Sequence, residues 1–307
     1  MKHLFIVNPT AGGKDKSIAV SRAVRAAFEN RDGDYEVYIT KAPMDAADKI
    51  REEAAVCEHL RVYACGGDGT FNECVCGAAK LANTAVAPFP TGTGNDFCRM
   101  FGAEKDLFRD LDALLDGTEH PIDLIDCNGR MSANICSVGI DARIGTEVHK
   151  YSGLPLIGGA GAYVVSAIVN ILKGVNRPMK VQAGSFVSEG EHALLCACNG
   201  RFYGGGFNPS PDARPDDGVL DIFVVPGVSL FTLALHIGQY ASGKADKCPK
   251  YITHLKGTEL HIEFEEENVI NIDGEVMLAK TVDMKLLPGA LNLIVPRGMK
   301  FFDDKTP

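Results

Sequence analysis

Positive charge is scarce in this 307-residue chain. Lysine and arginine together number 31, against 40 aspartates and glutamates, which leaves a net charge of −9 at pH 7. A protein with this balance is a poor candidate for binding the phosphates of DNA or RNA, so we expect no nucleic-acid partner. The sequence also lacks a polybasic cluster of the kind that holds proteins on anionic membranes.

Long apolar runs and metal-type cysteine spacings are missing as well. No stretch reaches the ~18–20 uninterrupted apolar residues of a membrane-spanning helix, so we expect no transmembrane segment. The ten cysteines contain no Cys-x-x-Cys and stand mostly among apolar or small residues, so we interpret them as buried free thiols. Reduced thiols, and an N-terminus that resembles a strand and not a signal peptide, favour a cytoplasmic protein.

The composition is otherwise that of a globular enzyme with about two domains. Apolar residues make up 46% and charged residues 23% of the chain, which excludes a disordered or collagen-like protein. In the first third we expect strands over 4–7, 35–40, 60–65 and 84–89, and helices over 17–29, 45–57 and 70–80. This alternation predicts a doubly wound parallel sheet with helices on both faces. Ligands of such sheets bind at the carboxyl ends of the strands.

From about Pro121 the pattern changes to short β-rich runs separated by glycine, asparagine, aspartate and proline. We expect strands over 121–127, 130–138, 179–187, 192–198, 219–225, 258–264, 269–272, 281–287 and 290–295. Because only two or three helices interrupt them, these runs indicate a β-sandwich-like second domain. The predicted fold class is α/β plus β, with a cleft where the two domains meet.

The strongest local feature is Gly66-Gly67-Asp68-Gly69-Thr70, where an apolar strand runs into glycines and then into a helix. Glycines let backbone N–H groups converge on an anion, and a helix N-terminus favours phosphate. Asp68 would repel a bare phosphate, so its presence indicates Mg²⁺ between the two. A tight turn in which Asp68 caps the helix explains the same residues, and both interpretations stay open.

Two further glycine-rich segments also follow predicted strands. They are Asn8 to Gly13 (Asn-Pro-Thr-Ala-Gly-Gly) and Pro90 to Asp96 (Pro-Thr-Gly-Thr-Gly-Asn-Asp). Three such strand ends in one sheet favour a nucleotide phosphate site over three unrelated turns. The spacings Gly-x-x-x-x-Gly-Lys-Ser/Thr, Gly-x-Gly-x-x-Gly and Gly-x-Ser-x-Gly are all absent, which argues against the commoner phosphate loops and a hydrolase nucleophile.

Short motifs continue in order along nearly the whole chain. They are Asn8-Pro9-x-x-Gly12, Gly66-Gly67-Asp68-Gly69-Thr70, Pro90-x-Gly92-Thr93-x-Asn95-Asp96, Asn134-x-x-x-x-Gly139-x-Asp141-Ala142, Asn199-Gly200-x-x-x-Gly204-Gly205-Gly206, Pro211-x-Ala213-x-x-Asp216-Asp217-Gly218-x-Leu220-Asp221 and Ile272-Asp273-Gly274-Glu275. Together they resemble the signature of the diacylglycerol kinase catalytic-domain superfamily, which includes bacterial soluble diacylglycerol kinases and sphingosine kinases.

The resemblance implies an ATP-binding α/β domain over 1–122, rejoined by about 296–307, and a β-rich lipid-substrate domain over 123–295. It implies an active site in the cleft between them. The residues that would contact the nucleotide are Asn8, Pro9, Thr10, Ala11, Gly12, Thr40, Gly66, Gly67, Asp68, Gly69, Thr70, Glu73, Thr93 and Asn95.

The resemblance also implies roles for several carboxylates. Asp68 and Asp96 would hold or orient catalytic Mg²⁺, and Asp273 and Glu275 would supply the general base at the lipid hydroxyl. A second, structural Mg²⁺ would be bound by Asp217, by the backbone carbonyl of Arg214 and by that of Val219. From the residues alone, Asp273-Gly274 also fits a tight hairpin turn, and the region of Asp217 also fits an ordinary turn.

The sequence therefore predicts an ATP- and Mg²⁺-dependent kinase that phosphorylates the hydroxyl of a lipid, first of all diacylglycerol, to give phosphatidic acid. Another lipid alcohol, a sphingoid base or a soluble acceptor such as NAD stays an alternative, as does a non-catalytic nucleotide-binding regulator. We expect weak, reversible contact with the membrane surface that carries the lipid. The apolar stretches 160–172 and 228–240 are the candidates for receiving acyl chains or touching the membrane, and a homodimer stays open.

Overall fold

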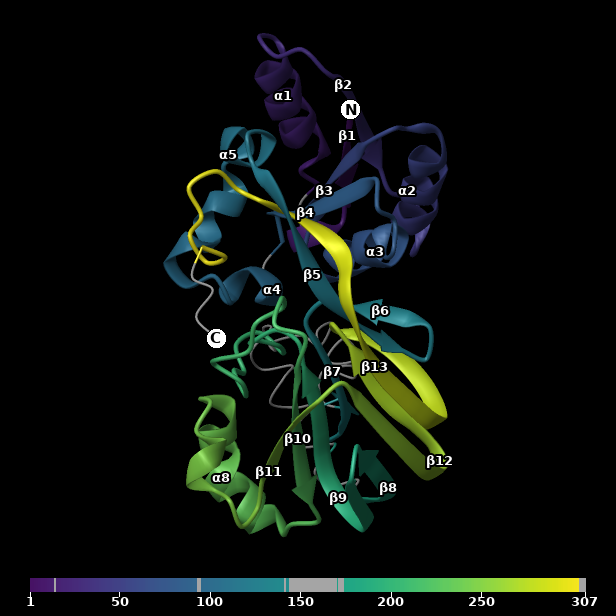
Figure 1. The fold of residues 1–307 in the computed structure, drawn as a ribbon, viewed down its shortest axis with the longest axis vertical. Helices are drawn as coiled ribbons and strands as arrows, with labels where there is room; N and C mark the ends of the chain where they lie inside the picture. Colours follow the sequence, from purple (N-terminus) through teal and green to yellow (C-terminus); the bar gives the residue numbers. More distant parts are fainter. Residues whose placement is uncertain (14, 93–94, 141, 144–169, 171–173, 304–307) are drawn as a thin grey trace. The chain divides into compact units, whose positions relative to one another are not determined.

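The computed structural model describes residues 1–307 except 14, 93–94, 141, 144–169, 171–173 and 304–307. The chain forms two compact units (Figure 1). The first comprises Met1–Leu124 together with Pro288–Pro307, and the second comprises Ile125–Leu287. The first unit thus takes in residues 123–124 and 288–295, which the sequence analysis assigns to the second domain.

A parallel sheet forms the centre of the first unit. Its strands are β1 (Lys2–Val7), β2 (Asp34–Ile39), β3 (Leu60–Gly66) and β4 (Thr84–Pro90), in the spatial order β4-β3-β1-β2. Strands β1 and β3 are almost completely buried and are apolar over 4–7 and 62–65, as expected where both faces of a parallel sheet are covered. The end of β13 (Glu275–Val295) adds a further parallel strand beside β4.

Helices α1 (Ser17–Phe28), α2 (Asp45–Val56) and α3 (Asp68–Ala78) alternate with these strands along the chain. Helices α2 and α3 pack closely, because a Cβ at Gly77 would lie 2.8 Å from the Cα of Ala47. After β4 come α4 (Asp96–Arg99), the 3-10 helix η2 (Gly102–Arg109) and α5 (Leu111–Leu115). A 3-10 turn, η1 (Ala11–Gly13), follows β1.

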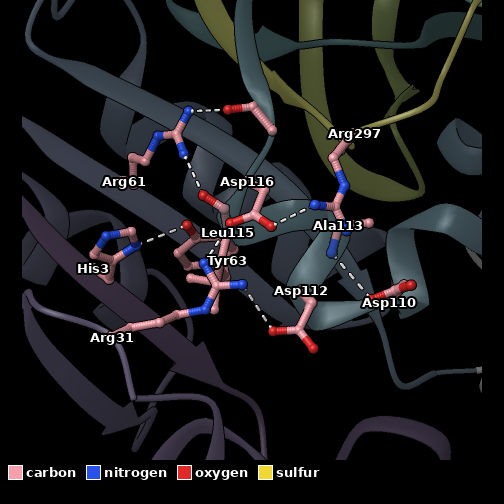
Figure 2. Close-up of polar contacts among 11 residues, drawn as sticks. His3, Arg31, Arg61, Tyr63, Asp110, Asp112, Ala113, Leu115, Asp116 and Arg297 are labelled. Atoms are coloured by element: carbon pink, nitrogen blue, oxygen red, sulfur yellow. Dashed lines mark hydrogen bonds and ion pairs between the residues drawn. The ribbon is translucent and has the colours of Figure 1, made fainter. Parts of the chain in front are cut away.

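A polar cluster fixes α5 and the last segment of the chain within the first unit (Figure 2). The Arg61 side chain is 8% exposed and donates to the backbone oxygens of Leu115 and Gly117. Asp116 accepts from Arg31 on one side and from Arg297 on the other. Arg61 Nε also donates to Glu119 Oε1 at 2.8 Å, which gives the buried guanidinium the charged partner that its burial requires.

The second unit is built from antiparallel strands. They are β6 (Arg130–Ser132), β7 (Ile135–Gly139), β8 (Arg177–Ala183), β9 (Phe186–Cys198), β10 (Leu220–Pro226), β11 (Thr253–Gly257) and β12 (Glu259–Ile272), with parts of β5 (Thr118–Cys127) and β13. Both β7 and β8 pair with the same two long strands, β9 and β12. The two long strands therefore flank both β7 and β8, each over a different part of its length.

Strand β9 shows how the second unit is packed. Leu195 and Ala197 belong to the hydrophobic core cluster that also contains Ile222 and Ile262. The alternate residues of β9, Leu194 among them, enter a different core cluster that includes residues of α8 (Leu230–Ala241). Burial on both faces explains why this segment is continuously apolar.

Several expected strands have different limits in the structure. The run 130–138 is divided into β6 and β7, and the run 179–187 is divided between β8 and β9. Conversely, 258–264 and 269–272 form the single strand β12 with an irregular register between Glu263 and Asn268, and 281–287 and 290–295 both lie in β13. All ten cysteines are described and free, and eight of them are buried, as expected.

No helix in the described part of the chain is both long and apolar enough to cross a bilayer. The apolar stretch 160–172 lies outside the described residues except for Asn170. The second apolar stretch, 228–240, contains all of α8 except its last residue.

Candidate functional site

The three glycine-rich segments come together at one edge of the parallel sheet. Strands β1, β3 and β4 are neighbours, so their carboxyl ends share that edge. The Asn8 side-chain amide donates to Thr70 Oγ1 at 3.1 Å, which joins the first segment to the second. The backbone N–H groups of Thr91 and Gly92 donate to the Gly66 carbonyl at 2.9 and 3.0 Å, which joins the second to the third.

Glycine is required at the points where these segments touch. A Cβ at Gly92 would lie 2.9 Å from the Cα of Gly67, closer than real Cβ contacts allow. Gly12 has a φ of 71°, in the left-handed region, and a Cβ there would lie 3.1 Å from the Thr91 carbonyl oxygen. The edge is therefore lined by closely packed backbone, as an anion-binding cradle requires.

Asp68 connects two of the segments. Its Oδ2 accepts the N–H of Asn95 and its Oδ1 accepts the N–H of Asp96, both at 2.7 Å. Asp68 is itself the first residue of α3, whose N-cap is Gly67. The carboxylate therefore holds the start of α4 and does not cap its own helix, which corrects that part of the turn interpretation.

Asp96 lies directly beside Asp68. It is 7% exposed, and Arg99 Nε lies 3.0 Å from its Oδ1. Carboxylates on two residues in direct contact supply oxygen donors of the kind that suit a hard divalent cation. Within the described residues, no group of three or more His, Cys, Asp and Glu side chains gathers as a metal centre. A cation here would need further oxygen ligands from phosphate or water.

The other residues expected at the nucleotide lie on or near the same edge. The N–H of Thr40 donates to the Val7 carbonyl at 3.0 Å, at the end of β2, and Thr10 donates to the Asn8 side chain. Pro9 and Ala11 lie in the segment after β1, and Gly69 and Glu73 lie in the first turns of α3. Thr93 lies outside the described residues.

Two cationic side chains that the sequence analysis did not select lie at this edge. Lys16 Nζ donates to the Thr91 carbonyl, and Arg99 lines a pocket of about 270 Å³. The pocket residues are Pro90, Asn95, Cys98, Arg99, Lys105, Asp106 and Arg109. Their positions in the sequence could have identified both side chains. Lys16 comes just after the first glycine segment, and Arg99 follows Asp96 by one helical turn.

Thiols near the edge are not candidates for nucleophiles. Cys65 ends the apolar part of β3, and Cys98 lies in α4. Burial raises the pKa of both thiols far above the ordinary value, so neither forms thiolate near neutral pH.

Asp273 stands at the hairpin between β12 and β13 in the second unit. Asp273 and Gly274 have φ values of 51° and 94°, as in a two-residue turn of the Asp-Gly type. The Asp273 Oδ1 accepts from Ser132 Oγ at 2.6 Å and from the Ile135 N–H at 2.9 Å, and Oδ2 accepts from the Ala133 N–H at 2.9 Å. The hairpin interpretation is therefore confirmed, and the turn also holds this carboxylate firmly.

Glu275 is less constrained than Asp273. Its side chain is 46% exposed, and its Oε2 lies 3.6 Å from Arg130 Nη2. Ser132, the fully buried donor to Asp273, is a residue that the sequence analysis missed. It precedes Asn134 by two positions but belongs to no motif, so only its long-range contact identifies it.

The region of Asp217 has the hydrogen bonds of a compact turn. Asp217 Oδ1 accepts the N–H of Val219 at 3.0 Å, and Arg214 Nε lies 3.1 Å from Asp216 Oδ1. Asp217 is exposed, so its carboxylate can reach solvent ions. The structural Mg²⁺ with Arg214 and Val219 stays a prediction.

Comparisons with known proteins agree with this arrangement of motifs. A family model described as "Diacylglycerol kinase catalytic domain" matches residues 2–127, and one described as "YegS C-terminal NAD kinase beta sandwich-like domain" matches residues 134–295. The chain is 30% identical over 289 residues to "Probable lipid kinase YegS-like" of Pseudomonas aeruginosa PAO1, with 93% of each chain covered. It is 26% identical to "Diacylglycerol kinase" of Bacillus subtilis strain 168, with 88% of each covered.

A solved structure is similar over nearly the same length. The crystal structure of a diacylglycerol kinase from Bacillus anthracis str. Sterne matches with a TM-score of 0.69 and 27% sequence identity. The match covers 97% of this chain and 98% of the other. The two-part architecture is therefore shared with that protein.

Proposed function

The chain belongs to the diacylglycerol kinase catalytic-domain family of lipid kinases, and from that premise we propose that it transfers the γ-phosphoryl group of ATP to the hydroxyl group of diacylglycerol. The product would be phosphatidic acid. Diacylglycerol is the acceptor named for the Bacillus subtilis relative and for the Bacillus anthracis structure, which supports this choice among lipids.

The carboxyl edge of the parallel sheet is the observation that supports the proposal most directly. Three strand ends meet there, and a Cβ at Gly92 or Gly12 would lie only 2.9 or 3.1 Å from the backbone of a neighbouring segment. The N-terminus of α3 lies at the same edge. Closely packed backbone and a helix N-terminus suit the phosphates of a nucleotide.

The residues present also fit the divalent cation that kinases use. Asp68 and Asp96 would hold Mg²⁺ together with phosphate and water oxygens. When bound, the ion neutralises charge on the transferring phosphoryl group. Lys16 and Arg99 add positive charge at the same edge and would pair with phosphate oxygens.

The reaction also requires a base for the acceptor hydroxyl. In this proposal the hydroxyl oxygen bonds to the γ-phosphorus, the bond from that phosphorus to the bridging oxygen breaks, and ADP leaves. The hydroxyl proton passes to a carboxylate, for which we propose Asp273, with Glu275 as the second candidate. The three hydrogen bonds to Asp273 give it a fixed position, whereas Glu275 is half exposed. A positioned base contributes about 10²–10⁴-fold to such a rate.

The test is transfer of labelled γ-phosphate from ATP to diacylglycerol in detergent micelles. We expect Asp68→Ala and Asp273→Ala to lower the rate by about 10²-fold or more while thermal unfolding stays cooperative. Asp48→Ala is the matched control, because the Asp48 side chain is 72% exposed on α2. A rate unchanged in Asp273→Ala would remove the proposed base, and Glu275→Gln would then be tested in the same assay.

NAD is a second candidate acceptor, because the description of the family that matches residues 134–295 names an NAD kinase domain. One assay with diacylglycerol, a sphingoid base and NAD separates the acceptors. ATP binding without product from any acceptor would instead favour a non-catalytic regulator.

A further inference from the structure

Helix α8 presents an apolar, uncharged face to solvent. Leu230, Phe231 and Leu235 are 48%, 78% and 63% exposed. Ala234 and Gly238 are exposed as well, and at 100° per residue all five positions share one side of the helix. The twelve residues of α8 include no charged side chain. A surface helix ordinarily has polar residues on its outer side, so this face is unusual.

The opposite side of α8 is already packed. Leu233, Ile237 and Tyr240 lie against the core cluster that contains Leu194 and Phe223. The cavity beneath the helix is only about 30 Å³, which is room for one or two water molecules and not for an acyl chain. The helix therefore does not enclose a lipid tail, and its outer face is not a displaced part of the core.

Lysines follow α8 directly. Lys244, Lys247, Lys250 and Lys256 are all exposed, and Asp246 is the one acidic residue from 228 to 257. Because no two of these lysines are adjacent in the sequence, they do not form a recognisable polybasic run. A local excess of lysine directly after an apolar helix is notable in a chain of net charge −9. In Figure 1 this segment continues from α8 towards β11.

We infer that the outer face of α8, together with these lysines, docks on an anionic phospholipid surface. Apolar side chains would enter the interface between headgroups and acyl chains, and the lysines would pair with anionic headgroups. The inference rests on the proposed function, since a kinase whose acceptor lies in a membrane must reach that surface. It assigns the contact to one helix.

Vesicle sedimentation without nucleotide tests the inference. Vesicles of phosphatidylcholine mixed with phosphatidylglycerol should bind the protein, binding should weaken as salt increases, and phosphatidylcholine alone should bind less. Phe231→Ser and Leu235→Ser should each lower the partition coefficient about tenfold. The matched control is Leu278→Ser, because Leu278 is 59% exposed on β13 and should leave binding unchanged.

Charge reversal gives an independent comparison. Lys244→Glu with Lys247→Glu should weaken binding to the anionic vesicles, whereas Lys280→Glu with Lys285→Glu changes the net charge equally on β13 and should not. In the kinase assay, Phe231→Ser should slow phosphorylation of vesicle lipid severalfold and leave the rate in detergent micelles unchanged.

Two results would overturn the inference. In the first, the wild-type protein does not bind anionic vesicles but still phosphorylates diacylglycerol in micelles, which would leave the proposed function intact. In the second, analytical ultracentrifugation shows that the wild-type protein is a dimer and that Phe231→Ser is a monomer, since the face would then be covered by a second copy of the chain. Vesicle binding without any kinase activity would instead count against the proposed function alone.

Discussion

A single buried hydroxyl is expected to tune the proposed base. Ser132 is fully buried and donates to the Asp273 carboxylate at 2.6 Å. We predict that Ser132→Ala lowers kcat about tenfold, with little change in KM for ATP, because Asp273 loses one of the groups that position it.

Ser132→Thr keeps the hydroxyl and should restore most of the rate. If Ser132→Ala and Ser132→Thr lose activity and thermal stability equally, Ser132 has only a structural role.

His3 makes the stability of the protein depend on pH. Burial and the nearby Arg61 guanidinium lower the pKa of His3 from 6.5 to about 4. The unfolded chain therefore takes up a proton at a pH where the folded chain does not, and the free energy of unfolding falls as the pH drops from 6.5 towards 4. We predict that His3→Gln reduces this loss by roughly 2 kcal/mol.

Urea unfolding followed by circular dichroism at both ends of this range measures the difference. His261→Gln is a control of opposite sign, because hydrogen bonding to Asp283 raises the pKa of His261. The contribution of His261 to the free energy of unfolding is present below pH 6.5 and is lost as the pH rises. Equal pH dependence in wild type and His3→Gln would contradict the prediction.

At the scale of elements, the packing of the glycine segments governs the nucleotide edge. A Cβ at Gly92 would lie 2.9 Å from backbone of the neighbouring segment, so Gly92→Ala must push β3 and β4 apart at their ends. We predict a rise in KM for ATP of about tenfold or more with cooperative unfolding retained. Gly257→Ala is the control, since its Cβ would make an ordinary 3.7 Å contact with Ile222. Similar KM values in both variants would exclude a special role for this packing.

The sequence anticipates elements better than contacts between them. Alternating strands and helices place three glycine segments at one sheet edge, and Asp273-Gly274 has the composition of a tight hairpin. The hydrogen bonds that the start of α4 donates to Asp68, and that Ser132 donates to Asp273, join residues 27 to 141 positions apart, so no local pattern predicts them. The exposed run of glutamates at 265–267 has the composition of a loop but lies within β12. The register of β12 is irregular between Glu263 and Asn268, so the alternation of buried and exposed residues that marks a strand is lost there.

At the scale of the whole molecule, the first unit is assembled from two distant parts of the chain. Leu291, Leu293, Ile294 and Val295 are buried in the part that returns, and each contributes at most about 1.5–3 kcal/mol through burial. Their sum is comparable with the total stability of about 5–15 kcal/mol of an ordinary domain. We therefore predict that a fragment of residues 1–124 does not unfold cooperatively.

Joining residues 288–303 to this fragment through a short flexible linker should restore a cooperative thermal transition in circular dichroism. Fusion of an equally long glycine–serine segment is the control. A cooperative transition in the bare fragment would show that the returning segment is dispensable.

The polypeptide crosses from one unit to the other at two places, near residues 124 and 287, and both lie inside strands, β5 and β13. Proteases cut extended, unpaired backbone, which hydrogen-bonded strands do not offer. Limited digestion is therefore expected to cleave loops within a unit before it cleaves either of the two crossings between the units. A cut near residue 124 would leave residues 288–307 covalently attached to the second unit while they stay packed in the first, so residues 1–124 would be released only on unfolding.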